Sequence, residues 1–511
     1  MKGGERMAAG SYLNVKTDYG AAGNGTNNDT APIRKAIEDA IRLGGATVYL
    51  PIGTYRITGL EVSGSFNMIG DGEDSVLLSD DRTRSVLKIS NASGAFWRGF
   101  KIKSTAGTDY SKRNPLLNGL FLSGADRCTV EGLFVENTYA AGILVSGCTG
   151  TSIVGCQVRN TLADGIHFTG RSKDCTAAHN TLSETGDDGI AVVSYLGDKD
   201  VCERILITGN HVNRSWARGI SHVGGRNVTI ADNFVLASAS SGILVVEDKN
   251  YGTYPPTDTV IHHNQVIQAG TYVPPRPLSG NKIGVEVASG ASGVRIDGNT
   301  VKESKAAGLA VSGGGTGISI AGNHVYRNRA TGVELADLSK VTFTGNTVEL
   351  NFKYGLFATR VTYGLFTGNR WVNNNCFDMD NPAMGTPNAN TLAIDNANFN
   401  ACNDCTIADN LSVDDRTDRS RARVERAIEI SGSRRIKTGG NRCYVYNADP
   451  SKAVTTESFL AWNAECERMD AFTGAGVPDA KIYKAGQFYF RTDTKELYLY
   501  DGSAWRRLAL N

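Results

Sequence analysis

Asp164, Asp187 and Asp188 are the residues whose type and spacing best fit acid–base chemistry. Asp164 and Asp188 each stand directly before a Gly-Ile pair, and Arg218 stands before another Gly-Ile pair further along the chain. If these segments stack as successive turns of a repeat, neighbouring strands lie about 4.8 Å apart, so the two aspartates become neighbours with Arg218 one turn on. Asp187 precedes Asp188 and must point in a different direction in an extended backbone.

Two carboxylates this close resist being ionised together, so the pKa of one should rise, as a general acid requires. Glycoside hydrolysis uses such a pair, in which one group protonates the leaving oxygen while the other activates water or attacks the sugar. We therefore predict that all three aspartates are catalytic. Asp188 is the expected general acid, because it lies between a like charge and the protein interior, and Arg218 would hold a substrate oxygen or keep one carboxylate ionised. The competing interpretation is that Asp-Gly simply forms a turn of the repeat.

Further polar and aromatic residues nearby are candidates for substrate binding. His167 falls in an outward column beside the aspartates, whereas His222 shares the column of Val192 and Val245, so strand alternation directs its side chain inward. Glu247 and Asp248 follow a later strand and either contact substrate or form a solvated turn. The expected substrate-binding residues are Arg218, His167, His222, Glu247, Asp248 and, as a platform for a sugar ring, Trp216. No metal ligand is expected among them.

A repeat of 23 or 24 residues, with longer gaps where loops are inserted, positions these side chains. Its first mark is a glycine that opens a short alternating apolar run, at Gly142, Gly165, Gly189, Gly219, Gly242, Gly284, Gly308, Gly332 and Gly355. Its second mark is an asparagine before an apolar or Thr-led step, at Asn210, Asn233, Asn299, Asn323, Asn346 and Asn369. The two series run in phase, which is typical of a solenoid.

Each repeat is too small to bury its own apolar face, so we expect the units to stack and to pair their short strands with the units above and below. Asn suits the turns because it tolerates left-handed backbone angles and can hydrogen-bond to the next Asn in the stack. A leucine-rich repeat is disfavoured because its Leu-x-x-Leu-x-Leu frame is absent. The pattern predicts an all-β fold, a right-handed single-stranded parallel β-helix from about residue 60 to about residue 440.

Residues 14–60 precede the repeats and predict a helix followed by a strand pair. Asp29 or Thr30 can cap the helix, and Pro32 lies in its first turn. The apolar face of the helix consists of Ile33, Ala36, Ile37 and Ile41. The segment resembles the N-terminal segment of pectate-lyase-like β-helix proteins, a superfamily that includes lyases, hydrolases, epimerases and phage tailspikes. The resemblance implies that the helix covers the open end of the solenoid.

Residues 160–225 resemble the polygalacturonases, β-helix enzymes that hydrolyse pectin with inversion. Leu162-Ala-Asp164-Gly-Ile is similar to their Asn-Thr-Asp-Gly motif, Gly186-Asp187-Asp188-Gly to their Gly-Asp-Asp-Cys motif, and Arg218-Gly-Ile-Ser to their Gly-His-Gly-Ile-Ser motif. Arg218 stands where the family has His, and Leu244 and Val246 stand where the family binds the sugar carboxylate with Arg-x-Lys. The resemblance thus implies a hydrolase whose substrate is not galacturonate.

The C-terminal part differs in character, because the repeat fades after about Asn441 and residues 446–511 are richer in Trp, Tyr and Phe. Residues 486–508 alternate as a β-hairpin would, and they resemble the small β-modules of phage tail fibres and spikes. A plain cap on the solenoid end is the alternative. We expect three parts: an N-terminal segment with the capping helix (1–60), a catalytic β-helix (61–445), and a C-terminal β-rich cap or trimerisation module (446–511).

Charge and composition exclude several functions. The 53 Lys and Arg residues balance 52 Asp and Glu, so no nucleic-acid-binding surface is expected. No apolar run reaches the roughly 20 residues of a membrane helix, and Met1–Arg6 lacks the apolar core of a signal peptide. Among the ten cysteines, Cys402-x-x-Cys405 has no second pair for a metal. Four cysteines that precede Thr are expected to stack as buried reduced thiols: Cys128, Cys148, Cys175 and Cys405.

These features together predict a phage tailspike-like or prophage-derived depolymerase, a glycoside hydrolase that cuts bacterial surface polysaccharide as a homotrimer without a cofactor. It would belong to the virion or act outside the cell after lysis. The first alternative is a polysaccharide lyase or uronate epimerase, which needs a base aimed at C5 and Ca²⁺ or Arg to neutralise a carboxylate. The second is a non-catalytic glycan-binding adhesin or structural spike.

Overall fold

The computed structural model describes residues 12–275, 280–376, 395–416, 424, 426–445, 467–468, 472–474, 488–491, 494–501 and 503–508. The expectations for Met1–Arg6 and for most of residues 446–511 lie outside the described residues. The chain divides into two compact units, residues 1–282 and 283–511. The domain boundaries expected at residues 60 and 445 stay predictions.

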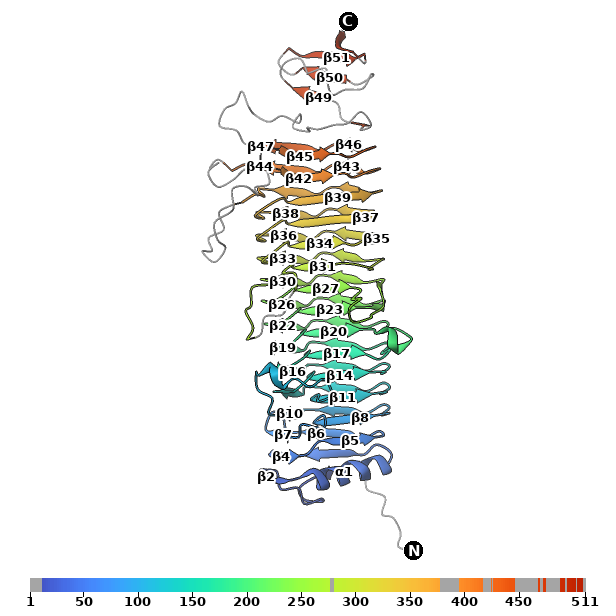
Figure 1. Cartoon of the computed structure of the whole chain (residues 1–511), viewed down its shortest axis with the longest axis vertical. Coiled ribbons are helices and arrows are strands. Elements are labelled where there is room, and N and C mark those ends of the chain that lie inside the picture. The colour runs from blue at the N-terminus through green and yellow to red at the C-terminus, as the bar shows by residue number, and fades with distance from the viewer. Residues whose placement is uncertain are drawn as a thin grey trace. The chain divides into compact units, whose positions relative to one another are not determined.

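Unit 1 is a right-handed parallel β-helix that contains three strands in each coil (Figure 1). Two successive coils consist of β14 (Ile143–Ser146), β15 (Ser152–Val154), β16 (Gln157–Thr161), β17 (Ile166–Thr169), β18 (Thr176–Ala178) and β19 (Thr181–Thr185). Each strand pairs in parallel with its counterpart in the neighbouring coil. The stack of β14 and β17 extends through β5 (Leu60–Ser63), β8 (Leu87–Ser90), β11 (Leu120–Ser123), β20 (Ile190–Val193), β23 (Ile220–Val223) and β27 (Ile243–Val246).

The apolar core lies inside the coils because every second residue of a strand points inward. Ile166, Ile190 and Ile220 begin β17, β20 and β23, lie in register, and are fully buried. The glycine before each of these strands is required by packing. A Cβ on Gly165 would lie 2.5 Å from Cδ2 of Leu182 and 2.6 Å from the carbonyl oxygen of Gly189 in the next coil. Glycine is therefore needed at this position of these coils, because a larger residue would clash. The residue before the glycine varies from coil to coil.

The expected asparagine stacking is confirmed. In unit 1, Asn180, Asn210, Asn233 and Asn264 occupy equivalent turns, and the Nδ2 of each of the first three donates to the Oδ1 of the next Asn at 2.9 Å. All four side chains are buried. The ladder satisfies polar groups that the turns would otherwise leave unpaired inside the protein.

Replacing Asn210 by Ala should lower the free energy of unfolding by about 2–4 kcal/mol, because it leaves the amide groups of Asn180 without their acceptor. The control is Asn250→Ala in an exposed turn, whose side chain should contribute little. Calorimetric melting of both variants checks the prediction. Equal melting temperatures for the two variants would contradict the stabilising role of the ladder.

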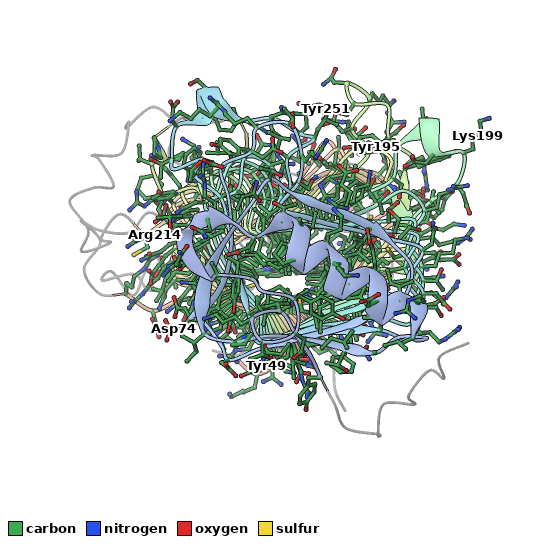
Figure 2. The ribbon with its side chains drawn as sticks, turned by 90° about the horizontal axis from the view of Figure 1, so that it is seen from below. Tyr49, Asp74, Tyr195, Lys199, Arg214 and Tyr251 are labelled. Carbon is green, nitrogen blue, oxygen red and sulfur yellow. The ribbon has the colours of Figure 1, made fainter. Side chains whose placement is uncertain are left out.

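The N-terminal helix α1 (Thr30–Arg42) packs against β1 (Leu13–Asn14), β3 (Thr47–Leu50) and β5. Figure 2 shows it lying across the end of the coils, as the resemblance implied. The expected strand pair is also present, as β3 and β4 (Gly53–Ile57). Two details of the helix expectation are wrong. Ala40 is buried on the inner face while Ile41 is only half-buried. Asp29 holds the N-cap position, but its carboxylate accepts from the N–H groups of Ala22 and Gly23 and makes no cap bond.

Unit 2 repeats the coil architecture. Its main stack consists of β31 (Val285–Val287), β34 (Leu309–Ser312), β37 (Val333–Thr344), β39 (Leu356–Thr362), β42 (Asp395–Asn400) and β45 (Arg426–Ser431). A four-stranded sheet near the C-terminus contains β49 (Phe472–Gly474), β50 (Phe488–Arg491), β51 (Glu496–Tyr500) and β52 (Trp505–Leu508). β50 and β51 pair antiparallel, which confirms the expected hairpin.

The cysteines expected to stack are buried free thiols. Cys128, Cys148 and Cys175 each donate to backbone carbonyls, and burial raises the pKa of all three thiols. Cys402 and Cys405 are also buried, with their thiols directed at backbone carbonyls. The geometry of these five cysteines is that of core packing. None of the helices in the described part of the chain is long and apolar enough to cross a bilayer.

Candidate active site

Asp164, Asp188 and Arg218 occupy one column on three successive coils. Each lies two residues before the first strand residue of its coil, and the amide N–H groups of Gly165 and Gly189 donate to the carbonyls of Asp188 and Arg218 at 2.9 and 3.0 Å. The column is the one inferred from the sequence. Together with Asp187, the two aspartates place one carboxylate oxygen each within 4.8 Å of one another.

Part of the role of Asp164 and Asp188 is structural. Oδ1 of Asp164 accepts the backbone N–H of Asp188 at 3.0 Å, and Oδ1 of Asp188 accepts the backbone N–H of Arg218 at 2.9 Å. Asn118 makes the same bond to Ala141 on an earlier coil, at 3.2 Å. The bond therefore requires an oxygen acceptor and no charge, so the ionisable group at positions 164 and 188 needs another explanation.

The second oxygen of Asp164 contacts His167. Oδ2 lies 2.6 Å from Nδ1 of the imidazole, which points outward from β17 as predicted. Burial alone would raise the pKa of Asp164, but His167 and the hydrogen bond outweigh it and the pKa lies below its ordinary value. Burial alone would lower the pKa of His167, but the carboxylate outweighs it and the pKa is raised. Each group therefore favours the charged form of the other.

Asp188 is the most enclosed of the three aspartates, with a side chain only 3% exposed. Its Oδ2 accepts from Oγ of Ser221 at 2.5 Å, and Oδ1 lies 2.9 Å from Nε of Arg218. This last contact is an ion pair by distance, although the Nε–H does not point along it. Burial raises the pKa of Asp188 against the opposing charge of Arg218. Its side chain is almost closed to solvent, so Asp188 is poorly placed to reach a substrate.

Asp187 is more accessible than the other two aspartates, with a side chain 23% exposed. Burial and the charges of Asp164 and Asp188 raise its pKa to about 7, against the opposing effect of Arg218 and Arg113. Its Oδ2 lies 3.3 Å from Nη2 of Arg113. Asp187 is therefore the carboxyl group that can hold a proton near neutral pH and still meet a ligand.

Arg113 belongs to an insertion, residues 104–118, between β10 (Lys101–Lys103) and β11. The insertion contains the short 3₁₀ helix η1 (Tyr110–Lys112). Arg113 was not predicted from the sequence, because it lies 74 residues from Asp187. Ser221 was not predicted either, although strand alternation places it in the outward column of His167. Gly119 opens a further repeat, and the long stretch of sequence between Lys103 and Gly119 is the signal that indicates an insertion.

Two expected binding residues do not face the site. The Trp216 side chain is 1% exposed because Tyr110 of the insertion covers it, with the ring centroids 6.1 Å apart. The ring is therefore not available as a sugar platform. His222 is fully buried inside the coil, where Nδ1 lies 3.1 Å from Oγ1 of Thr259 and burial lowers its pKa to about 3. A neutral histidine inside the coil cannot contact a substrate on the outer surface.

The residues after β27 form a turn beside the site. Oδ1 of Asp248 accepts the N–H groups of Asn250 and Tyr251 at 3.0 and 3.3 Å, as expected of a solvated turn, and Glu247 is half-buried. Two backbone bonds join this turn to residues 194–196. Figure 2 shows Tyr195 and Tyr251 on the same side of unit 1. Burial, followed by the charge of Asp164, raises the pKa of Tyr195 to about 12, so its hydroxyl stays protonated.

The three aspartates are close enough to share a cation. In this arrangement, however, each carboxylate already has a cationic partner from the chain: His167 for Asp164, Arg113 for Asp187 and Arg218 for Asp188. The cluster therefore combines carboxyl groups of different character, because the pKa of Asp187 is raised and that of Asp164 is lowered.

The chain belongs to the family described as the right-handed β-helix region, which matches residues 93–266, 141–324 and 278–449. Among solved structures it is similar to a tailspike protein of E. coli bacteriophage HK620, solved in complex with a pentasaccharide. The TM-score is 0.53 at 10% identity, and the match covers 83% of this chain and 77% of that chain. This likeness shows a shared fold.

Curated relatives match over short stretches. Mannuronan C5-epimerase AlgE1 of Azotobacter vinelandii is 40% identical over 83 residues, which are 14% of this chain and 6% of that protein. Alginate lyase 7 of the same organism is 54% identical over 46 residues, 9% of this chain and 5% of that protein. The chain thus spans only a small part of the length of these relatives.

Proposed function

We propose that this protein is a polysaccharide-cutting glycoside hydrolase whose active site is formed by Asp164, Asp187 and Asp188. The observation that carries the proposal is the carboxylate cluster, in which Asp164, Asp187 and Asp188 place one oxygen each within 4.8 Å of one another and Asp187 is the most accessible. The pKa of Asp187 is raised to about 7, while that of Asp164 is lowered. Neighbouring carboxyl groups with separated pKa values are the arrangement that glycoside hydrolysis requires.

In the proposed mechanism, Asp187 donates its proton to the glycosidic oxygen and Asp164 accepts a proton from the attacking water. His167 orients Asp164 and keeps it ionised through the 2.6 Å contact. Arg113 and Arg218 stabilise the negative charge that Asp187 acquires when it gives up its proton. Asp187 thus replaces Asp188 as the proposed acid, because the Asp188 side chain is only 3% exposed whereas that of Asp187 is 23% exposed.

Several features support a polysaccharide substrate. The site lies on the outward side of the coils, beside a turn that carries Tyr251, which is 74% exposed and suited to stacking on sugar rings. The tailspike fold and the carbohydrate-active relatives agree with this substrate class. We also propose a homotrimer that acts as part of a virion or outside the cell and needs no cofactor.

The matches to an epimerase and a lyase favour a second candidate, elimination or epimerisation at a uronate C5. Such a reaction needs a cation free to neutralise the sugar carboxylate. Arg113 and Arg218 are each paired with an aspartate, and Leu244 lies in the outward column of His167 where a basic residue would be needed. A Ca²⁺ ion would have to supply the charge instead. The geometry supports hydrolysis better.

Incubating the protein with a panel of bacterial surface glycans tests the proposal. We expect new reducing ends without absorbance in the unsaturated-uronate band, and activity that declines as the pH rises through about 7, because Asp187 then loses its proton. Absorbance in that band would indicate the lyase instead. Binding without cleavage of any glycan would indicate an adhesin.

A further inference from the structure

The insertion 104–118 is anchored over several coils beside the aspartates. Thr105 contacts the Tyr139 hydroxyl at 3.0 Å, and the N–H of Asn114 donates to the Tyr139 carbonyl at 2.9 Å. Ala106 and Leu117 form a buried apolar cluster with Tyr139 and Leu162. Leu162 lies two residues before Asp164, so the inner side of the insertion packs against the segment that leads into the catalytic column.

Two further contacts join the insertion to the coils that contain Asp187 and Arg218. The Tyr110 ring stacks on Trp216, at an interplanar angle of 29°. Tyr110 holds Arg113 through two contacts. Nη1 of Arg113 donates to the Tyr110 hydroxyl at 2.5 Å, and the guanidinium lies 5.4 Å from the centre of the Tyr110 ring. Its remaining Nη2 faces Asp187. The aromatic pair therefore fixes the arginine that contacts the proposed acid.

We infer that Arg113 is a positioning residue of the active site, which holds Asp187 toward the substrate and sets the pH at which it gives up its proton. This inference rests on the proposed function for its effect on cleavage, but the coupling of the two side chains does not. A bare surface ion pair contributes little. Here the arginine is 34% exposed and the aspartate 23% exposed, and the arginine is braced by a stacked aromatic pair.

The charged groups that act on Asp187 determine the direction of the effect. Asp164 and Asp188 favour its protonated form, whereas Arg218, Arg113 and the imidazolium of His167 favour its ionised form. Removing Arg113 deletes one of these favourable charges, so Asp187 should keep its proton to a higher pH. The basic limb of the activity profile should therefore move upward, and the misplaced acid should react more slowly.

The test compares Arg113→Ala and Arg113→Lys with Lys112→Ala. Lys112 is the matched control, because it is the neighbouring residue at the end of η1 and pairs with Asp109 instead of a catalytic residue. With a cleavable glycan, we expect Arg113→Ala to lower kcat by about 10–100-fold. The basic limb of its pH–activity profile should move to higher pH by at least about 0.5 pH units. In Arg113→Lys, the basic limb of the activity profile should return most of the way to its wild-type pH. Lys112→Ala should behave as wild type.

A second measurement does not depend on activity. In the wild type, Asp187→Asn should raise the melting temperature at about pH 8, because it removes a carboxylate that is costly to ionise, and should have no such effect near pH 4. In the Arg113→Ala background this gain at about pH 8 should be larger. An equal gain in both backgrounds, or an unchanged basic limb, would overturn the inference. If no glycan is cut, the proposed function fails while the melting comparison still decides whether Arg113 acts on Asp187.

Discussion

Replacing Asp187 by Asn should lower the rate of glycan cleavage by about 10²–10⁴-fold, the usual loss when a general acid is removed. Asn preserves the size of the side chain but cannot donate a proton to the glycosidic oxygen. The substitution should also leave the protein folded and, at about pH 8, more stable. The raised pKa means that ionising Asp187 costs folded stability as the pH rises from about 4 to about 7.

Asp164→Asn and Asp188→Asn separate the structural and chemical roles of the column. An Asn at either position can still accept the backbone N–H of the next coil, as Asn118 does. Asp164→Asn should therefore keep the backbone bond and lose activity on the same scale, while loss of the ionised contact with His167 should lower the melting temperature at neutral pH. Asp188→Asn should weaken the ion pair with Arg218 and the hydrogen bond from Ser221. It should lose less activity than Asp187→Asn.

Progress curves on one cleaved glycan, with melting temperatures measured in parallel, check these expectations. Wild-type turnover in Asp187→Asn would contradict the assignment of the acid. Full activity in all three variants would place the active site elsewhere. Lost stability with unchanged specific activity would favour the interpretation of Asp-Gly as a turn of the coil.

Replacing Ile190 by Asp should have the largest effect on folding. Ile190 is fully buried at the start of β20, in register with Ile166 and Ile220 of the neighbouring coils. A carboxylate there has no partner and no water, so the free energy of unfolding should fall by several kcal/mol, about 4 or more. We expect a large drop in melting temperature or accumulation of the variant as aggregates.

The matched control is Leu206→Asp, on the outward side of β21 (Leu206–Thr208) and 37% exposed. This side chain reaches solvent, so its replacement should change stability by less than about 1 kcal/mol. Ile190→Val, which keeps the apolar contact, should cost about 0.5–1.5 kcal/mol. Melting temperatures and soluble yields of the three variants give the comparison. A stable, soluble Ile190→Asp protein would contradict an interior of close-packed coils.

The coil architecture and the alignment of Asp164, Asp188 and Arg218 were predictable from the amino-acid sequence. Glycine recurs where adjacent coils leave no room for a Cβ, and asparagine recurs where the turns need a stacked amide. Both columns therefore mark the register of the stack. In a parallel stack with fixed register, residues at equivalent positions must become neighbours, so the aspartate column followed from spacing alone.

Only the tertiary structure decided which aspartate can act as the acid and which neighbours serve it. Periodicity specifies the side of a strand on which a residue lies, but the exposure and the occupied oxygens of Asp187 and Asp188 depend on contacts across coils. The insertion that covers Trp216 and brings Arg113 to Asp187 follows no repeat. Its position results from packing between residues far apart in the chain, which no local pattern encodes.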